Sequence, residues 1–79
     1  MQQVYIQFRN AEQVKRFVNM IDTFEVHFDL GSGRKTVNAK SILGILALDL
    51  SEPLRLRYDS DDARIIERIS PFLLEKQAV

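Results

Sequence analysis

The sequence predicts a two-layer α+β fold, an open-faced sandwich in which three helices cover one face of a four-stranded antiparallel sheet. Three observations support this prediction. Some short segments alternate apolar with polar residues, as strands do, and others repeat apolar residues every three or four positions, as helices do. Glycine or proline separates many of them. The predicted order is β-α-β-β-α-β-α, and residues 1–79 are expected to form a single domain.

The first half predicts a strand, a helix and a hairpin. Alternation indicates strands at residues 2–8, 25–30 and 35–39. Helical spacing covers residues 11–24, and Asn10 is placed to cap this helix, with Gln13 at its third position as in a capping box. Gly-Ser-Gly at 31–33 predicts the hairpin turn, with a loop of three to five residues.

The second half predicts a helix, a strand and a last helix. Residues 41–50 read as a short helix that ends before Pro53, and residues 54–58 alternate strictly. Residues 59–69 read as the last helix, capped by Asp59 or Ser60. Its buried stripe is expected to consist of Ile65, Ile66 and Ile69.

Composition excludes several classes of function. Eleven basic and eleven acidic side chains cancel, so the charge indicates neither a nucleic-acid nor a membrane partner. Without cysteine there is no disulfide and no thiolate metal site. No apolar run is long enough for a membrane span and no secretory signal is recognisable, so a cytoplasmic protein is expected.

The sequence offers no motif that would support catalysis. It has no nucleophile with a base and no carboxylate pair that would form a cleft. Gly-Ser-Gly-Arg-Lys at 31–35 is too short for a phosphate loop, and it reads as a turn with two solvated cations. His27 is the single histidine and is predicted on the outward face of the second strand. We therefore expect no enzyme activity, no metal site and no cofactor.

The segment Lys-Thr-Val-Asn-Ala-Lys-Ser-Ile-Leu-Gly-Ile-Leu-Ala-Leu, residues 35–48, resembles the central segment of HPr, the phosphocarrier protein of the bacterial sugar phosphotransferase system (PTS). In that family a strand leads into Lys-Ser-Ile-Met-Gly and a short helix. The matching residues are Thr36, Val37, Asn38, Lys40, Ser41, Ile42 and Gly44, with Leu43 at the methionine position. The predicted order of elements also agrees over the whole chain, so the resemblance implies the HPr-like fold.

The same resemblance implies that the phosphocarrier histidine is missing. In HPr this histidine opens the first helix within His-Ala-Arg-Pro-Ala, where the present chain reads Asn10, Ala11, Glu12, Gln13 and Val14. An asparagine amide is not a nucleophile near neutral pH, and Glu12 would repel a phosphoryl group. The chain is therefore similar to Crh, the HPr homologue that lacks this histidine.

Ser41 has two readings that do not exclude each other. Many HPr proteins and Crh are phosphorylated by a dedicated kinase, HPr kinase, on the matching serine, and the phosphorylated form docks on a transcription factor of carbon catabolite control. The resemblance implies the same for Ser41, and Lys40 supplies a neighbouring cation. Alternatively, Ser41 only caps the helix that follows.

The apolar residues of this helix exceed what one buried face accommodates. Ile45 and Leu48 are predicted in the core, with Ile42 or Leu46 sharing that role, and Leu43 is predicted to be exposed. An exposed apolar patch commonly marks a contact surface, so Ile42, Leu43, Leu46 and Lys40 form a candidate partner-binding patch. The alternative is that the surplus serves packing alone.

The sequence thus predicts a regulatory, protein-binding member of the HPr family, linked to the PTS and to carbon regulation. One alternative is a diverged interaction module with no part in sugar transport. Another is an RNA-binding α+β domain, which needs aromatic residues on the open face of the sheet. Phe8, Phe28 and Tyr58 are predicted on the helix side and only Tyr5 faces the other way, so direct binding of nucleic acid is not expected.

Overall fold

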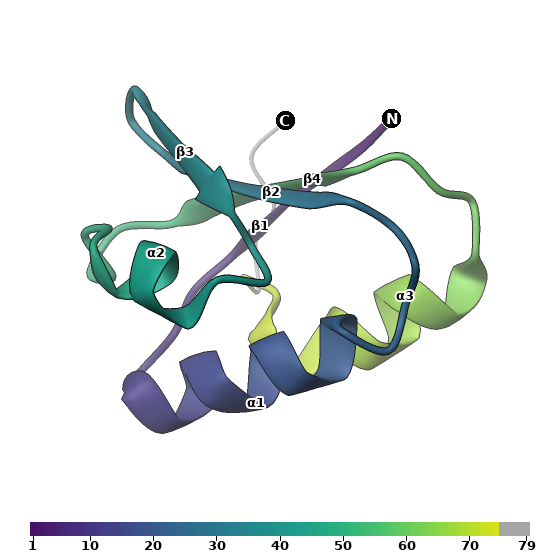
Figure 1. Cartoon of the computed structure of the whole chain (residues 1–79), viewed down its shortest axis with the longest axis horizontal. Helices are drawn as coiled ribbons and strands as arrows, with labels where there is room; N and C mark the ends of the chain where they lie inside the picture. Colours follow the sequence, from purple (N-terminus) through teal and green to yellow (C-terminus); the bar gives the residue numbers. More distant parts are fainter. Residues whose placement is uncertain (75–79) are drawn as a thin grey trace.

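The alternating segments pair into one antiparallel sheet in the computed structural model, which describes residues 1–74. The strands are β1 (Gln2–Ile6), β2 (Phe28–Ser32), β3 (Lys35–Asn38) and β4 (Leu54–Tyr58), in the spatial order β1-β4-β2-β3. Every pair of neighbouring strands is antiparallel. The predicted fold class is confirmed, including the helices on one face of the sheet (Figure 1).

Four short helical segments complete the described chain. They are α1 (Ala11–Ile21), α2 (Ile42–Leu46), α3 (Ala63–Ile69) and the single 3-10 turn η1 (Ser70–Phe72). Figure 1 shows α1 and α3 side by side in the helical layer, with α2 next to β3. Within residues 1–74 no helix is both long and apolar enough to cross a membrane.

The core lies between the sheet and the helices. The largest side chains that fully leave the solvent come from three of the strands and from each α-helix: Ile6, Val14, Phe17, Ile21, Phe28, Leu30, Ile45, Leu54, Leu56, Ile65 and Ile69. Phe8 and Tyr58 are also buried, as the alternation predicts, whereas Arg55 and Arg57 lie on the opposite face of β4. Burial of this apolar surface is the main force that stabilises the fold.

The hairpin differs from its prediction in both strand start and turn. The second strand was expected at 25–30, but β2 begins at Phe28, which pairs with Tyr58, the last residue of β4. Residues before Phe28 therefore have no strand beside them. The predicted turn at 31–33 is also wrong, because Gly31 is part of β2 and the loop has only two residues, Gly33 and Arg34. Of these two residues only Gly33 has positive φ, +59°, as a type II′ hairpin turn requires at its first position.

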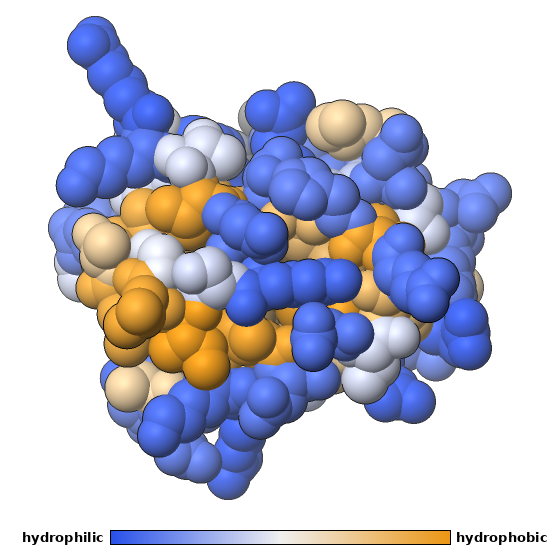
Figure 2. Space-filling model, viewed as in Figure 1, coloured by the Kyte–Doolittle hydropathy of each residue, from blue (hydrophilic) through white to orange (hydrophobic). Residues whose placement is uncertain are grey.

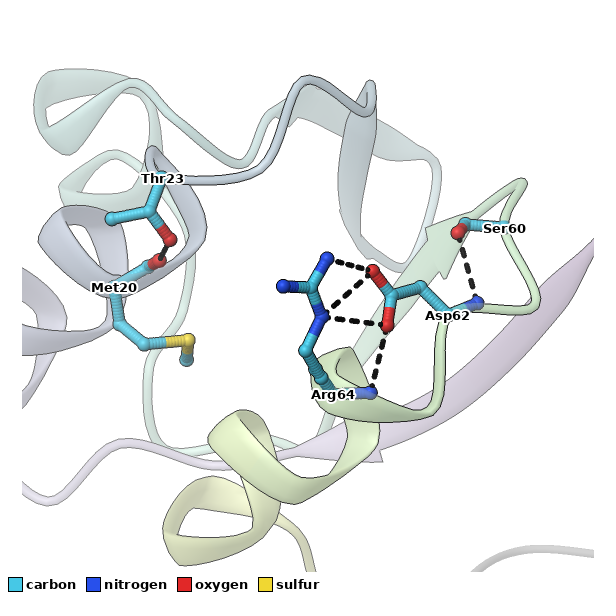
Figure 3. Close-up of polar contacts among 5 residues, drawn as sticks. All are labelled: Met20, Thr23, Ser60, Asp62 and Arg64. Carbon is cyan, nitrogen blue, oxygen red and sulfur yellow. Dashed lines mark hydrogen bonds and ion pairs between the residues drawn. The ribbon is translucent and has the colours of Figure 1, made fainter.

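The last helix begins later than predicted. Residues 59–62 connect the strand to the helix, and the cap is Asp62 rather than Asp59 or Ser60 (Figure 3). The Asp62 carboxylate accepts the backbone N–H of Arg64 at 3.0 Å, while the Ser60 hydroxyl accepts the N–H of Asp62 at 3.1 Å. Ile66 is 39% exposed and so does not belong to the buried stripe.

Three other elements are shorter than predicted. The first strand ends at Ile6 rather than Phe8, although Phe8 is still buried. The helix expected at 41–50 ends at Leu46, because the N–H groups of Ala47 and Leu48 bond to residues three positions earlier. Helix α1 ends at Ile21 rather than at residue 24.

Candidate functional site

Ser41 stands where β3 turns into α2. The backbone N–H of Ser41 donates to the Asn38 carbonyl at 2.9 Å, which closes this turn. The Ser41 hydroxyl accepts the N–H of Gly44 at 3.1 Å, and the Ser41 backbone is extended, as at most helix caps. The prediction that Ser41 caps this helix is confirmed. The side chain is partly exposed, and its phosphorylation stays a prediction.

Gly44 brings α2 close to the sheet. A Cβ atom at this position would lie 3.2 Å from the Ser41 hydroxyl oxygen and 3.3 Å from Cβ of Val37 in β3. Both separations are shorter than ordinary van der Waals contact, so a larger residue would push the helix away from the strand or the cap. Close packing therefore explains why a glycine suits the last position of the Lys-Ser-Ile-Leu-Gly motif.

The apolar residues of α2 and of the turn that follows it divide between the core and the solvent. Ile45 and Leu48 are buried and Ile42 packs partly against the core, whereas Leu43 is 83% exposed and Leu46 is 44% exposed. Figure 2 shows that apolar surface gathers over α2. We call Ile42, Leu43 and Leu46 the α2 patch. The predicted division of the helix is confirmed, while a partner for the patch stays a prediction.

Lys40, predicted as part of the same patch, has its ammonium group engaged within the protein. The ammonium donates to the Phe24 carbonyl at 2.7 Å and lies 5.8 Å from the centre of the Phe28 ring. These contacts tie the start of α2 to the chain that follows α1. The charge of Lys40 thus stabilises the fold, and its contribution to partner binding stays a prediction.

The start of α1 is the place where the resemblance to HPr puts the phosphocarrier histidine. The Asn10 amide oxygen accepts the N–H of Gln13 at 2.9 Å, which confirms the predicted cap. The Gln13 side chain accepts the N–H of Arg9 at 2.7 Å, one residue before the position that a standard capping box uses. Glu12 lies in the exposed first turn.

An open groove adjoins this helix start. Its walls come from the end of β1, the first turn of α1, the loop before β4 and the C-terminal segment: residues 7–10, 13, 50–51 and 71–74. Ser51 donates its hydroxyl to the Asp49 carboxylate at 2.6 Å, and the Ser51 carbonyl accepts the Gln7 amide at 2.9 Å. The Ser51 hydroxyl and N–H lower the pKa of Asp49. Sequence reasoning predicted a break in the chain before Pro53 but missed the groove, because no pattern along the chain indicated it.

His27 lies away from both places. It precedes β2 rather than belonging to it, and its side chain is 69% exposed. The Nε2 atom is 2.8 Å from the Asp29 carboxylate. Among residues 1–74 no group of three or more histidine, cysteine, aspartate or glutamate side chains is arranged to hold a metal ion.

The comparisons with known proteins agree with this architecture. A family model described as "PTS HPr component phosphorylation site" matches residues 7–73. The crystal structure of HPr-C-His from Thermoanaerobacter tengcongensis is similar, with a TM-score of 0.74 and 29% sequence identity over 90% of this chain and 89% of that one. A search of curated proteins found no match. Because the family model spans most of the chain, and α2 with its cap lies inside the matched residues, this protein belongs to the HPr family of the bacterial phosphotransferase system.

Proposed function

We propose that this HPr-family protein acts by binding a partner protein through the α2 patch, and not by carrying a phosphoryl group on histidine. The observation that carries the proposal is the 83% exposure of Leu43, two residues after the Ser41 cap. Leaving a large apolar side chain in water forgoes the free energy of burying it, about 1.5–3 kcal/mol for a leucine. A partner that covers Leu43 and Leu46 recovers part of that free energy.

The start of α1 supports the loss of phosphocarrier activity. A phosphocarrier needs an imidazole nitrogen there, and Asn10 has instead a neutral amide that already accepts the Gln13 N–H. Glu12, at the position of the family arginine, adds negative charge where phosphoryl oxygens would lie. The single histidine, His27, is bonded to Asp29 in another part of the protein.

Phosphorylation of Ser41 would act on the same surface. A phosphoserine brings about −1.5 to −2 charges at neutral pH, and here they would lie beside Leu43. The partner would then face an apolar patch with an anionic edge. The candidate partners are an HPr kinase and a transcription factor of catabolite control, so the function is a regulatory one, of the Crh-like type, without enzyme activity.

A second candidate function is an interaction module with no role in sugar transport. It is favoured by Asn10 and Glu12, because they remove the chemistry through which the family joins the phosphoryl relay. The RNA-binding alternative has no such support, since Phe8, Phe28 and Tyr58 are buried in the core.

The first test is intact-mass analysis after incubation with ATP and a bacterial HPr kinase. We expect one phosphoryl adduct on the native protein and none on Ser41→Ala. Circular dichroism of the variant must show that it is folded. If an authentic HPr is modified in parallel while this protein is not, regulation through Ser41 is excluded.

The second measurement asks whether the α2 patch binds. The phosphorylated protein is titrated with a catabolite-control transcription factor, and Leu43→Gln is compared with Ile66→Gln. Both replace an exposed apolar residue, but Ile66 is on α3. We expect Leu43→Gln alone to weaken binding. Phosphorylation without any binding would favour the second candidate function.

A further inference from the structure

Three cations from two separate parts of the chain lie at the hairpin end of the sheet. Arg34 and Lys35 are exposed at the tip between β2 and β3, where the register places Lys35 on the same side of the sheet as Leu30 and Val37. Arg55 comes from β4 and reaches the same tip, where its guanidinium donates to the Gly33 carbonyl at 2.8 Å. We call Arg34, Lys35 and Arg55 the hairpin cluster.

Gly31 makes room for the guanidinium of Arg55. The register places Gly31 directly opposite Arg55, on the sheet face that the helices do not cover. A Cβ atom at Gly31 would lie only 2.8 Å from Nη2 of Arg55. Gly31 is buried although it faces the open side, which is consistent with Arg55 lying over it. The absence of a side chain at Gly31 therefore allows the Arg55 guanidinium to lie in this position.

In the described part of the chain, no acidic side chain pairs with the hairpin cluster. Among residues 1–74 the ion pairs join Met1 to Asp59, His27 to Asp29 and Arg64 to Asp62, and none includes a member of the cluster. One N–H of Arg55 bonds to Gly33, and a guanidinium has five N–H donors. Like charges gathered in one place raise the local potential and attract anions.

We propose that the hairpin cluster is a second interaction surface, and that it binds an acidic segment of a partner protein. Guanidinium groups bind carboxylates in a bidentate geometry, so side chains of glutamate or aspartate complement the cluster. Arg55 lies on the open sheet face and Arg34 and Lys35 lie at the hairpin tip, whereas the α2 patch belongs to the helical layer. The proposal therefore does not depend on the function of Ser41 or of the α2 patch.

Single-stranded nucleic acid fits the same surface less well. Proteins that bind single strands combine cations with several aromatic side chains on which bases stack. Of the aromatic residues in the strands, only Tyr5 points to this face, opposite Arg55, because Phe28 and Tyr58 are buried on the other side. Carboxylates need no stacking surface.

The test is an NMR titration of the ¹⁵N-labelled protein with a synthetic hexaglutamate peptide, and separately with a hexathymidine oligonucleotide. We expect the peptide to shift the amide signals of residues 31–35 and 55 most, and added salt to weaken the binding. The proposal is overturned if the largest shifts lie elsewhere, if the peptide causes none, or if the oligonucleotide binds more tightly than the peptide.

Three variants locate the interaction. Arg55→Gln removes one charge of the cluster, and Gly31→Ala keeps the charge but displaces the guanidinium, because the flexible end of Arg55 can move. Each should raise the Kd for the peptide by about two- to fivefold, as expected for an exposed ion pair. Arg57→Gln, on the same strand and face, is the matched control and should leave the Kd unchanged. Equal losses for Arg55→Gln and Arg57→Gln would reduce the effect to net charge and refute the proposed site.

Discussion

At the scale of single residues, the Ser41 hydroxyl is already used by the fold. It accepts the Gly44 N–H at the start of a helix of only five residues. Any group attached to this oxygen therefore alters the bond that caps α2. The same hydroxyl can thus serve as a structural cap and as the point where modification changes the neighbouring α2 patch.

Replacing the cap should destabilise the protein by a predictable amount. We expect Ser41→Ala to lower the free energy of unfolding by about 1 kcal/mol, because the Gly44 N–H loses its acceptor. Ser41→Asp retains an acceptor and adds a favourable negative charge at the helix start, so its stability should remain close to native. Urea denaturation followed by circular dichroism measures both. Equal losses in the two variants would show that the cap bond contributes little.

At the scale of elements, prediction succeeds where the deciding interactions are local. Strand β4 has its predicted bounds, and Asn10 and Ser41 cap the helices that follow them, because alternation and capping act within a few residues. The predicted start of β2 is wrong, because the observed start depends on where the neighbouring strand β4 ends. The predicted cap of α3 is wrong because several residues that can cap a helix adjoin one another, and only the hydrogen bonds decide among them.

The candidate site was predictable to a similar degree. The exposure of Leu43 follows from counting apolar residues on a short helix, and the structure confirms it. The bond from Lys40 to the Phe24 carbonyl and the position of Arg55 over Gly31 join residues far apart in sequence. Neither leaves a pattern along the chain, so neither could be predicted.

The start of α3 should make stability depend on acid pH. Figure 3 shows the Asp62 carboxylate bonded to the guanidinium and the backbone N–H of Arg64, and these bonds lower its pKa below the ordinary 3.8. A carboxylate with a lowered pKa in the folded state contributes stability above its unfolded pKa. That contribution is lost as the pH falls through the folded pKa.

Asp62→Asn tests this dependence, because asparagine also caps helices but does not titrate. We expect the native protein to lose more stability than the variant between about pH 4 and about pH 2. Urea midpoints across that range give the comparison. The Asp49→Asn variant, at another carboxylate with a lowered pKa, serves as a reference for a distant position. Parallel curves for native protein and Asp62→Asn would contradict the assignment.

At the scale of the whole molecule, three phenylalanines join segments from the two ends of the described chain. Phe8 follows β1, Phe17 lies in α1 and Phe72 ends η1, with ring centroids 5.2 to 5.9 Å apart in edge-to-face contacts. The backbone supports the same connection, because the Gln7 N–H donates to the Phe72 carbonyl at 3.0 Å. The end of α3 is thereby fastened to the edge of the sheet.

Phe72→Ala should therefore cost far more than its place near the end of the described residues suggests. We expect a loss of about 3 kcal/mol, since a large buried ring is removed and two other rings lose a neighbour. That is a large part of the 5–15 kcal/mol typical of folded domains. Ile66→Ala, on the exposed side of the preceding helix, should cost about 0.5 kcal/mol. Urea denaturation measures the free energy of unfolding of both variants. Similar losses in the two would mean that the turn η1 contributes little to the stability of the fold.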